Sequence, residues 1–407
     1  MTVWDIAVIG AGVAGSTAAA LLAQRGLRVI LLDKGSYPRQ KVCGEFLSPE
    51  AVDVLGRVGV WPQIEAYHPP RIDGFTLTAG SRETRHKLSA PGYGVSRWVM
   101  DQALWEHAQQ AGVTTQERCT VTQVTGDFQQ GFCVTVQQAS SLSSPIRARA
   151  VLCAAGRQWQ PRGQPKTPVS GERSRFVGFK AHFQGVCLDR YIELHTVRHG
   201  YCGMVEVTGG VTNICCWIQA EALRRAGGKP QRFLSSAVAE NSALRLRLQG
   251  AEQVGASWTT TSFIYGRSVA PVVSGIWNIG DCAAMVAPLT GDGMGMALRA
   301  AELAATMMRA VFWQESAWDQ GTAEYARLWQ REFLPRLRWG RGLEATLLQP
   351  RLASLACVTL QHMPSLMEQI YRRTRYLFPL TPYRRRHRHD DHPGLDAPEG
   401  DHRFQRI

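Results

Sequence analysis

The first 33 residues hold the pattern that most constrains the fold. Residues 3–9 are apolar enough for a buried parallel strand. A glycine-rich turn follows, and residues 14–24 are small helix formers that end before Gly26. Residues 27–32 form a second apolar run. A strand, a tight turn, a helix and a second strand in this order predict the start of an α/β domain with a Rossmann-like parallel sheet.

The turn itself has the sequence GxGxxG, and an acidic residue follows the second strand. The glycines allow a tight turn and a close approach by a pyrophosphate, which the N–H groups at the start of the helix can bind. Asp33 is expected to accept hydrogen bonds from a ribose 2′-hydroxyl and to disfavour a 2′-phosphate. We therefore predict an adenosine diphosphate moiety, as in FAD or NAD. The residues predicted to bind it are Gly10, Gly12, Val13, Ala14, Gly15, Asp33 and Lys34.

A second glycine-rich loop favours FAD over NAD. The stretch GIWNIGDCAAMVAPLTGDGMGMAL, residues 275–298, is typical of a strand, an aspartate at its end, a loop and a long helix. Asp281 can bond a polyol hydroxyl. The loop N–H groups and the helix dipole can stabilise negative charge on a reduced flavin. An NAD enzyme has no need for such a second site, so FAD is the predicted cofactor.

With the helix start GVSRWVMDQAL at residues 94–104, these motifs resemble the FAD-dependent monooxygenase superfamily with the p-hydroxybenzoate hydroxylase fold, including its geranylgeranyl-reductase-like and halogenase-like branches. The resemblance covers residues 3 to 310. It implies an α/β fold with a GR2-type Rossmann-like FAD-binding domain, an interleaved antiparallel β-sheet substrate domain and a C-terminal helical segment. It also implies cofactor contacts at Cys43, Gly44, Arg97, Gly156, Asp281, Pro288, Gly291, Asp292, Gly293 and Met294.

The domains are expected to be interleaved along the chain. A FAD-binding domain is predicted from residues 1–70, 97–170 and 268–325, and a β-rich substrate domain from residues 71–96 and 171–267. One helix near residues 230–240 interrupts the β-rich part. Residues 326–380 are predicted to be helical, and the basic tail 381–407 to be disordered because it is polar and highly charged.

Three chemistries compete. The first, favoured slightly, is hydroxylation of an aromatic or lipophilic molecule through a flavin C4a-hydroperoxide. The second is reduction of isoprenoid or polyene double bonds, because KVCGEFLSPEA, residues 41–51, looks like the Cys-Gly loop of geranylgeranyl reductases, in which Cys43 would be catalytic. Halogenation is disfavoured, because the Trp-x-Trp-x-Ile-Pro motif of those members is missing. A non-catalytic flavoprotein would need a vestigial site, against which both intact glycine loops argue.

The electron donor is expected to be NAD(P)H or a reduced protein. Ala155-Gly156 stands where many members have Asp-Gly, which puts a role in NAD(P)H use in doubt but not FAD binding. Four residues of the β-rich part are candidate walls of a substrate pocket, although apolar residues in strands are more often core. They are Tyr201, Met204, Trp217 and Trp258. Three histidines, His182, His195 and His199, could act as acids or bases but are more simply structural.

Charge and cysteine content suggest the surroundings of the protein. The net charge is +13. The basic tail is more simply a solvated segment than a nucleic-acid site, so no nucleic acid is expected. The apolar stretch at residues 351–378 with its basic end suggests possible peripheral membrane contact. The ten cysteines lack zinc-like spacings, no metal is expected, and no signal peptide or membrane-spanning run is seen. These features favour a cytoplasmic protein with free thiols.

Overall fold

The computed structural model describes residues 2–138, 141–142, 145–156, 176–263 and 270–375. All of these described residues belong to one compact unit. The tail 381–407 lies outside the described residues, as do the domain boundaries placed at 170 and 267. The division into a FAD-binding and a substrate domain stays a prediction, while the two sheets below are observed.

The first sheet is built on the predicted parallel strands. Its central order is β16-β17-β10-β1-β2-β6, with β7, β8 and β9 joined through β10. The core strands β1, β2, β10 and β17 are parallel, as expected for a Rossmann-like domain. The strands are β1 (Val3–Ile9), β2 (Val29–Leu32), β6 (Thr114–Gln116), β7 (Cys119–Asp127), β8 (Gly131–Gln138), β9 (Ser141–Leu142), β10 (Ile146–Cys153), β16 (Val272–Val273) and β17 (Ile276–Asn278).

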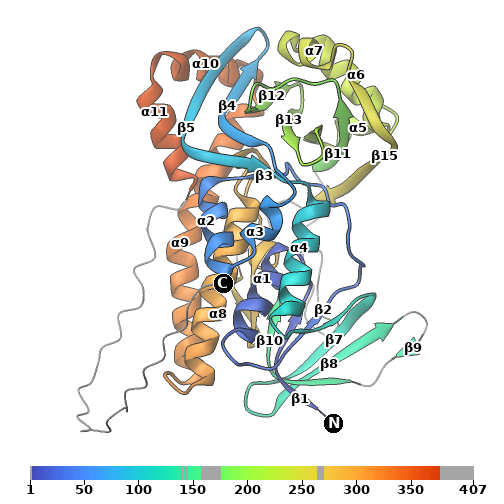
Figure 1. The fold of residues 1–407 in the computed structure, drawn as a ribbon. Helices are drawn as coiled ribbons and strands as arrows, with labels where there is room; N and C mark the ends of the chain where they lie inside the picture. Colours follow the sequence, from blue (N-terminus) through green and yellow to red (C-terminus); the bar gives the residue numbers. More distant parts are fainter. Residues whose placement is uncertain (1, 139–140, 143–144, 157–175, 264–269, 376–407) are drawn as a thin grey trace, which may run out of the picture. The chain divides into compact units, whose positions relative to one another are not determined.

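Different layers cover the two faces of this sheet (Figure 1). Successive residues of β1 point to opposite faces. Ile6 and Val8 pack with the helices α1 (Val13–Ala23), α4 (Arg97–Gln110) and α8 (Gly293–Phe312). Ala7 and Ile9 pack with apolar residues of β7 and β8. Both faces are therefore buried, which explains the continuous apolar run of the first strand.

The second sheet has the order β15-β11-β14-β13-β12-β4-β5-β3. Its strands are β3 (Phe46–Leu47), β4 (Arg71–Ala79), β5 (Arg82–Gly94), β11 (Phe176–Gln184), β12 (Tyr191–Val197), β13 (Gly200–Val207), β14 (Val211–Gln219) and β15 (Glu252–Phe263). An antiparallel sheet was predicted, but the pair β12–β4 is parallel. These two strands come from distant segments, so no hairpin turn forces them to run in opposite directions.

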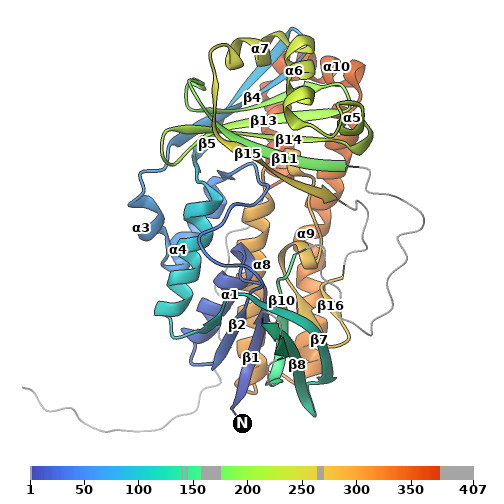
Figure 2. The same cartoon turned by 90° about the vertical axis from the view of Figure 1, so that its right-hand side faces the viewer.

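One face of the second sheet looks toward the carboxyl ends of the parallel strands, and helices cover the other face (Figure 2). The covering helices are α5 (Ala220–Arg225), α6 (Pro230–Glu240) and α7 (Ser242–Leu248). The prediction of one helix here found α6 with its proline at the first turn. It missed α5 and α7, because helices this short carry little periodic signal.

The C-terminal helices confirm the predicted helical segment. They are α9 (Trp318–Leu347), α10 (Pro350–His362) and α11 (Pro364–Arg373). α9 packs against α8, and α10 packs against β4 and β5. The remaining helices are α2 (Pro49–Val58), α3 (Trp61–Glu65), η1 (Gly280–Cys282) and η2 (Pro288–Thr290). Among the described residues, no helix has the length and apolar character needed to cross a bilayer.

Candidate functional site: a predicted FAD site between the two sheets

The GxGxxG turn lies at the carboxyl end of β1, beside the end of β10. Gly10 has a φ of +94°, and a Cβ atom there would lie 2.6 Å from the Ala154 carbonyl oxygen. A Cβ atom on Gly15 would lie 1.8 Å from the Gly10 carbonyl oxygen. Both glycines are therefore required for α1 to begin this close to the sheet. This brings the N–H groups of the first helical turn, which have no partner within the helix, to the sheet edge.

Asp33 anchors the same turn from the end of β2. Its Oδ2 atom accepts a hydrogen bond from the Ala11 N–H at 2.7 Å, and the Arg39 guanidinium donates to both oxygens at 2.5 and 2.9 Å. Burial raises the pKa of Asp33, but Arg39 outweighs that effect and holds the pKa at about 2. The Gly35 N–H and the Tyr37 hydroxyl also donate to this carboxylate, at 2.7 and 3.2 Å. Because a carboxylate has about four acceptor positions, the predicted ribose contact would compete with these donors.

Lys41 faces the glycine turn and was missed by sequence reasoning. Its Nζ atom lies 3.3 Å from where a Cβ atom of Gly12 would be. Among the described residues, it is the one atom from outside α1 and the turn itself within 4 Å of that position. Burial lowers the pKa of Lys41 to about 8, with Asp101 raising it and Arg97 lowering it. An ammonium beside a helix N-terminus suits a phosphate group. This space at Gly12 fits the diphosphate of FAD. The missed signal was the second of the two lysines in the loop after β2, because only Lys34 was predicted to bind the cofactor.

The pKa of Lys41 makes FAD affinity depend on pH. Because the pyrophosphate favours the protonated ammonium, we expect the dissociation constant of FAD to rise by up to about tenfold per pH unit above pH 8. Fluorescence titration of the FAD-free protein between pH 7 and 9 measures this slope. Lys41→Met should bind FAD more weakly at pH 7 and lose the slope. Lys229→Met changes an exposed lysine just before α6 and should keep the slope. Equal slopes in wild type and Lys41→Met would contradict this role.

Arg97 begins α4, as predicted, and its side chain is buried in the same region. The guanidinium forms a two-pronged ion pair with Asp101, with N···O distances of 2.7 and 2.8 Å. Burial lowers the pKa of Arg97, but Asp101 and the Cys43 thiol raise it above its ordinary value. Lys41 and Arg39 both have Asp33 and Asp101 among their charged neighbours. The structure thus gathers three cations and two carboxylates here. The one net positive charge suits an anionic cofactor.

Glu45 lies in the loop between β2 and α2, and its buried carboxylate accepts most of the side-chain contacts of this loop with the second sheet and α4. It is fully buried, with a φ of +60°, a conformation that costs a non-glycine residue free energy. Its carboxylate accepts hydrogen bonds from the Lys180 ammonium, from His182 Nε2 at 2.8 Å and from the Arg97 N–H at 2.7 Å. Burial raises the pKa of Glu45, but these partners hold it below the ordinary value. The contacts fit an interpretation of Glu45 as a loop-fixing residue and of His182 as structural.

Cys43 and Gly44 directly precede Glu45 in the chain. Cys43 is half-buried, and its sulfur accepts a hydrogen bond from the Glu45 N–H at 3.3 Å. The Arg97 guanidinium is an electrostatic neighbour of the thiol. The Cys43 carbonyl accepts a hydrogen bond from the Asn213 side chain at 3.0 Å. Gly44 is exposed. The loop is thus attached to the second sheet through β11 and β14, which places Cys43 between the two sheets.

The second glycine-rich loop lies beside the first one in space. A Cβ atom on Gly280 would lie 3.1 Å from the Ala14 Cβ atom, so the Gly280-Asp281 turn adjoins the start of α1. Gly156, with a φ of +80°, accepts a hydrogen bond from the Cys282 thiol at 3.1 Å. Asp281 is exposed. The three predicted cofactor segments therefore meet at one edge of the parallel sheet.

The loop then passes Pro288 and Gly291 to the start of α8. Pro288 and Gly293 are exposed, and Met294 is buried. Asp292 is buried, with Arg336 and Arg375 at N···O distances of 3.6 and 3.7 Å. Burial raises the pKa of Asp292. The two arginines lower it by a smaller amount, so the pKa stays above its ordinary value. These arginines come from the C-terminal helical segment, which the sequence did not connect with this loop.

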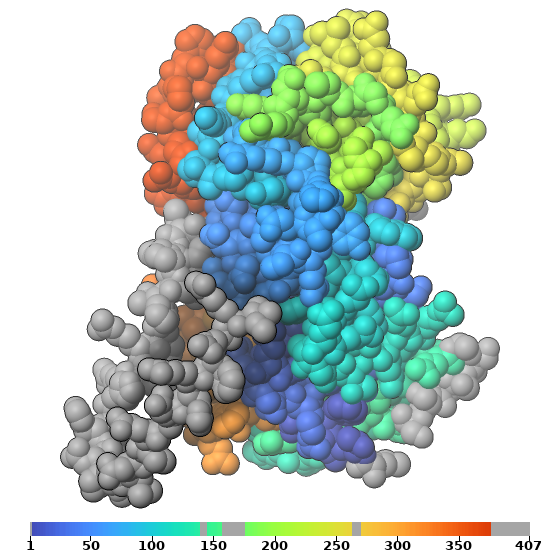
Figure 3. All heavy atoms as spheres, viewed as in Figure 1, coloured from blue at the N-terminus to red at the C-terminus, as the bar shows by residue number. Residues whose placement is uncertain are grey.

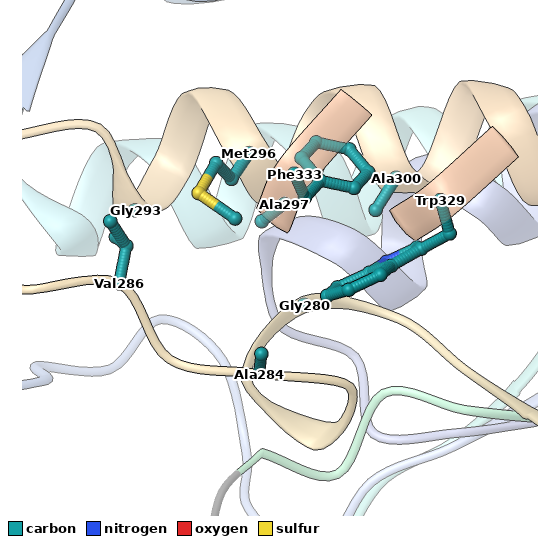
Figure 4. A pocket seen from close by; sticks show the side chains of 9 residues that line it. All are labelled: Gly280, Ala284, Val286, Gly293, Met296, Ala297, Ala300, Trp329 and Phe333. Atoms are coloured by element: carbon teal, nitrogen blue, oxygen red, sulfur yellow. The ribbon is translucent and has the colours of Figure 1, made fainter. Parts of the chain in front are cut away.

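A cavity lies behind this loop, between α8 and α9 (Figure 4). Its volume is about 10 Å³, which has room for about one water molecule. It is too small for a substrate, and it lies on the helix side of the first sheet. Its lining residues are Gly280, Ala284, Val286, Gly293, Met296, Ala297, Ala300, Trp329 and Phe333.

Two of the four predicted substrate-pocket residues face the site. Tyr201 and Trp217 are directly opposite each other on β13 and β14. They form an apolar wall with Phe176. Leu289 packs against this wall; it belongs to the second glycine-rich loop, residues 280–292, which we call the flavin loop. The Tyr201 hydroxyl donates to Glu344 Oε1 at 3.4 Å. Residues opposite each other in a sheet share a face, so this face is the one turned toward the predicted cofactor.

The prediction for Met204 and Trp258 was wrong. Met204 packs in the cluster beneath α6, on the far face of the second sheet. Trp258 packs against the same cluster, with its ring 5.4 Å from that of Phe179. Tyr201 and Met204 are three positions apart in one strand, and strand side chains alternate between faces, so the two cannot line one wall. His195 is also on the far face, where its Nδ1 atom lies 2.8 Å from the Thr78 hydroxyl, as expected for a structural histidine.

Comparison with known families agrees with this geometry. A family model described as an FAD binding domain matches residues 3–328. The chain belongs to this FAD-binding family. It is therefore an FAD-dependent oxidoreductase with the fold that the resemblance implied, and FAD is its cofactor.

Relatives of this FAD-binding protein include two curated reductases. Menaquinone reductase of Mycolicibacterium smegmatis is 28% identical, with 80% of this chain and 79% of the relative covered. Digeranylgeranylglycerophospholipid reductase of Methanosarcina mazei is 26% identical, with 74% of each chain covered. Among solved structures, a flavin-dependent brominase has a TM-score of 0.77 at 20% identity, covering 92% of this chain and 93% of that one. At that identity the similarity shows the fold alone.

Proposed function

We propose that this FAD-binding protein reduces a carbon–carbon double bond of an isoprenoid lipid. Bound FAD, once reduced, supplies a hydride to one carbon, and the other carbon takes a proton, so the double bond gains two electrons and two hydrogens. NAD(P)H or a reduced protein returns the electrons to the cofactor. The sequence placed hydroxylation slightly ahead. The position of Cys43 and the reductases among the relatives support reduction, although a chlorinase and a tryptophan halogenase are also relatives, at 25% and 24% identity.

The observation that carries the proposal is the setting of the Cys43 thiol. The Glu45 N–H donates to its sulfur at 3.3 Å, and the Arg97 guanidinium is a charged neighbour of the thiol. A thiol that donates a proton leaves a thiolate, and hydrogen bonds to an anion are stronger than those to a neutral group. Cys43 is thus well placed to be the proton donor, with Arg97 as its counter-charge.

The wall of the site suits an apolar chain. Phe176 and Trp217 stack with centroids 5.3 Å apart and planes 6° apart, and Leu194 and Leu289 pack against the same cluster. Apolar walls with few polar groups bind lipophilic molecules by removing their surface from water. The apolar contacts continue from Leu289 to Leu77 of β4 and to α10. This extent favours a long flexible substrate over a single ring.

Cys43→Ser separates the two chemistries. Under anaerobic conditions, with dithionite as reductant, the wild type should form a saturated product from menaquinone or from a digeranylgeranylglycerophospholipid. Cys43→Ser should lose this activity by about 100-fold or more, as expected on removal of a general acid, while its flavin absorbance shows FAD still bound. Cys215→Ser changes the neighbouring thiol and should retain activity. Full activity in Cys43→Ser would contradict the role of the thiol.

Hydroxylation remains a second candidate because of the stacked aromatic wall. Phe176, Tyr201 and Trp217 form one buried cluster, and aromatic side chains pack well against an aromatic ring. In this case the wild type would give product only with O₂ present, and labelled oxygen would appear in it. Product that forms without O₂ would exclude hydroxylation for that substrate.

A further inference from the structure

The exposed side of the last helices has an unusual composition. From Arg338 to Met363 the sequence contains one acidic residue, Glu344. Glu344 is buried, whereas the three arginines of this stretch, Arg338, Arg341 and Arg351, are exposed. The charged groups that this stretch presents to solvent are therefore all basic. We call the exposed residues between Arg338 and Met363 the C-terminal helical surface.

Large exposed apolar side chains occur in the same stretch of the chain as these arginines. Leu352 is 40% exposed and Leu355 61%, and both lie on α10. Met363, which follows α10, is 49% exposed, and Trp339 of α9 is 42% exposed. Leu352 and Leu355 are three positions apart, so they lie along one side of α10. Together with Met363, which directly follows the helix, we call them the apolar row. Single exposed apolar residues are common on proteins, but a row of them with a basic surround marks an interaction site.

The opposite side of α10 belongs to the predicted substrate region. Ala353 and Cys357 are buried with Leu77 and Ala79 of β4, and Leu289 of the flavin loop packs against the same cluster. Figure 3 shows α10 and α11 (red) at the surface, beside β4 and β5. One side of α10 thus carries exposed leucines, and its other side packs against apolar residues that contact Leu289 of the flavin loop. A lipid bound at this surface would lie close to the site.

We propose that the C-terminal helical surface binds the surface of an anionic lipid bilayer. The apolar row would enter the boundary between headgroups and acyl chains, and the arginines would meet the anionic headgroups. Trp339 and the arginine stems suit this boundary, because each has an apolar body and a polar end. The binding proposal stands on this surface alone. Its use as the access route for an isoprenoid lipid rests on the proposed function.

Vesicle sedimentation with the full-length, FAD-loaded protein tests the proposal. We expect binding to vesicles of phosphatidylcholine with phosphatidylglycerol, weaker binding to phosphatidylcholine alone, and weaker binding at high salt. The double variant Leu352→Ser/Leu355→Ser should reduce the partition coefficient by about tenfold or more. The matched control Leu246→Ser changes a leucine of α7 that is 70% exposed, and it should bind like the wild type. The triple variant Arg338→Gln/Arg341→Gln/Arg351→Gln should lose about fivefold per arginine and much of the salt dependence.

Three results would overturn the proposal. The first is that the wild type does not bind anionic vesicles. The second is that the leucine double variant binds as well as Leu246→Ser, which would place any membrane contact elsewhere in the chain. The third is a wild-type dimer in analytical ultracentrifugation that the leucine double variant abolishes, which would assign the surface to a second copy of the chain. Anaerobic reduction of a short detergent-dispersed isoprenoid tests the reaction separately, because it needs no bilayer.

Discussion

Replacing Gly15 with alanine should abolish FAD binding and lower the stability of the protein. The new Cβ atom would lie 1.8 Å from the Gly10 carbonyl oxygen and 3.0 Å from the Ala154 Cβ atom. Backbone atoms must then move apart, and α1 must retreat from the end of β1. The N–H groups of its first turn would then no longer reach the pyrophosphate of FAD. Each hydrogen bond to a charged group contributes about 1.5–3 kcal/mol. Losing two of them lowers FAD affinity by about 100-fold or more.

The measurement is the flavin content of the purified protein, followed by FAD titration and thermal unfolding. A matched control is Gly56→Ala in α2. A Cβ atom at Gly56 would meet no atom within 4 Å, so alanine there should leave FAD binding unchanged. It should stabilise the helix by about 0.5–1 kcal/mol. Normal flavin content in Gly15→Ala would mean that the turn can relax, and the close approach of α1 would then not be needed.

Glu45→Gln should cost the largest share of stability of any single change of charge at the site. Glu45 is fully buried, and its Lys180 partner is only 2% exposed. Removing one partner of a buried ion pair leaves an uncompensated charge and costs about 3–5 kcal/mol. Because these partners hold the pKa of Glu45 below its ordinary value of 4.5, the stability due to ionised Glu45 is present above pH 4.5. It is lost as the pH falls through the folded pKa.

Urea unfolding measures both effects. Glu45→Gln should be much less stable than the wild type at pH 7, and its stability should fall less below pH 4.5. Glu83→Gln is the control, because Glu83 and its partner Arg85 are each more than 40% exposed. Such a surface pair contributes about 1 kcal/mol or less. The double variant Glu45→Gln/Lys180→Met should recover part of the loss. If it is as unstable as Glu45→Gln, the buried charge of Lys180 is not the cause.

Local patterns in the sequence predicted the elements that local physics determines. The glycine turn, its two flanking strands and α1 are continuous in the chain, and each carries its own signal of apolar runs, glycines and small helix formers. Pro230 and Pro350 lie at the first turns of α6 and α10, where proline is favoured. The meeting of the two glycine-rich loops could be inferred because parallel strands bring their carboxyl ends to one edge.

Contacts between distant segments could not be inferred in this way. Nothing in the loop that contains Glu45 indicates that Lys180 and His182, more than 130 positions later, supply its partners. Arg375 reaches Asp292 from the end of the described chain, although its local sequence is typical of a solvated basic helix end. The error at Met204 was of another kind. Strand alternation between Tyr201 and Met204 was available in the sequence and would have separated the two residues.

The ion cluster at Asp292 limits how this chain can be divided. Asp292 lies inside the region 3–328 that matches the family, whereas Arg336 and Arg375 lie beyond it. A fragment that ended at residue 328 would keep a buried carboxylate beside Glu50 and lose both counter-charges. The FAD-binding part is therefore not an autonomous module. The last helices complete its electrostatics, so flavin binding and the folding of the C-terminal helices should be thermodynamically linked.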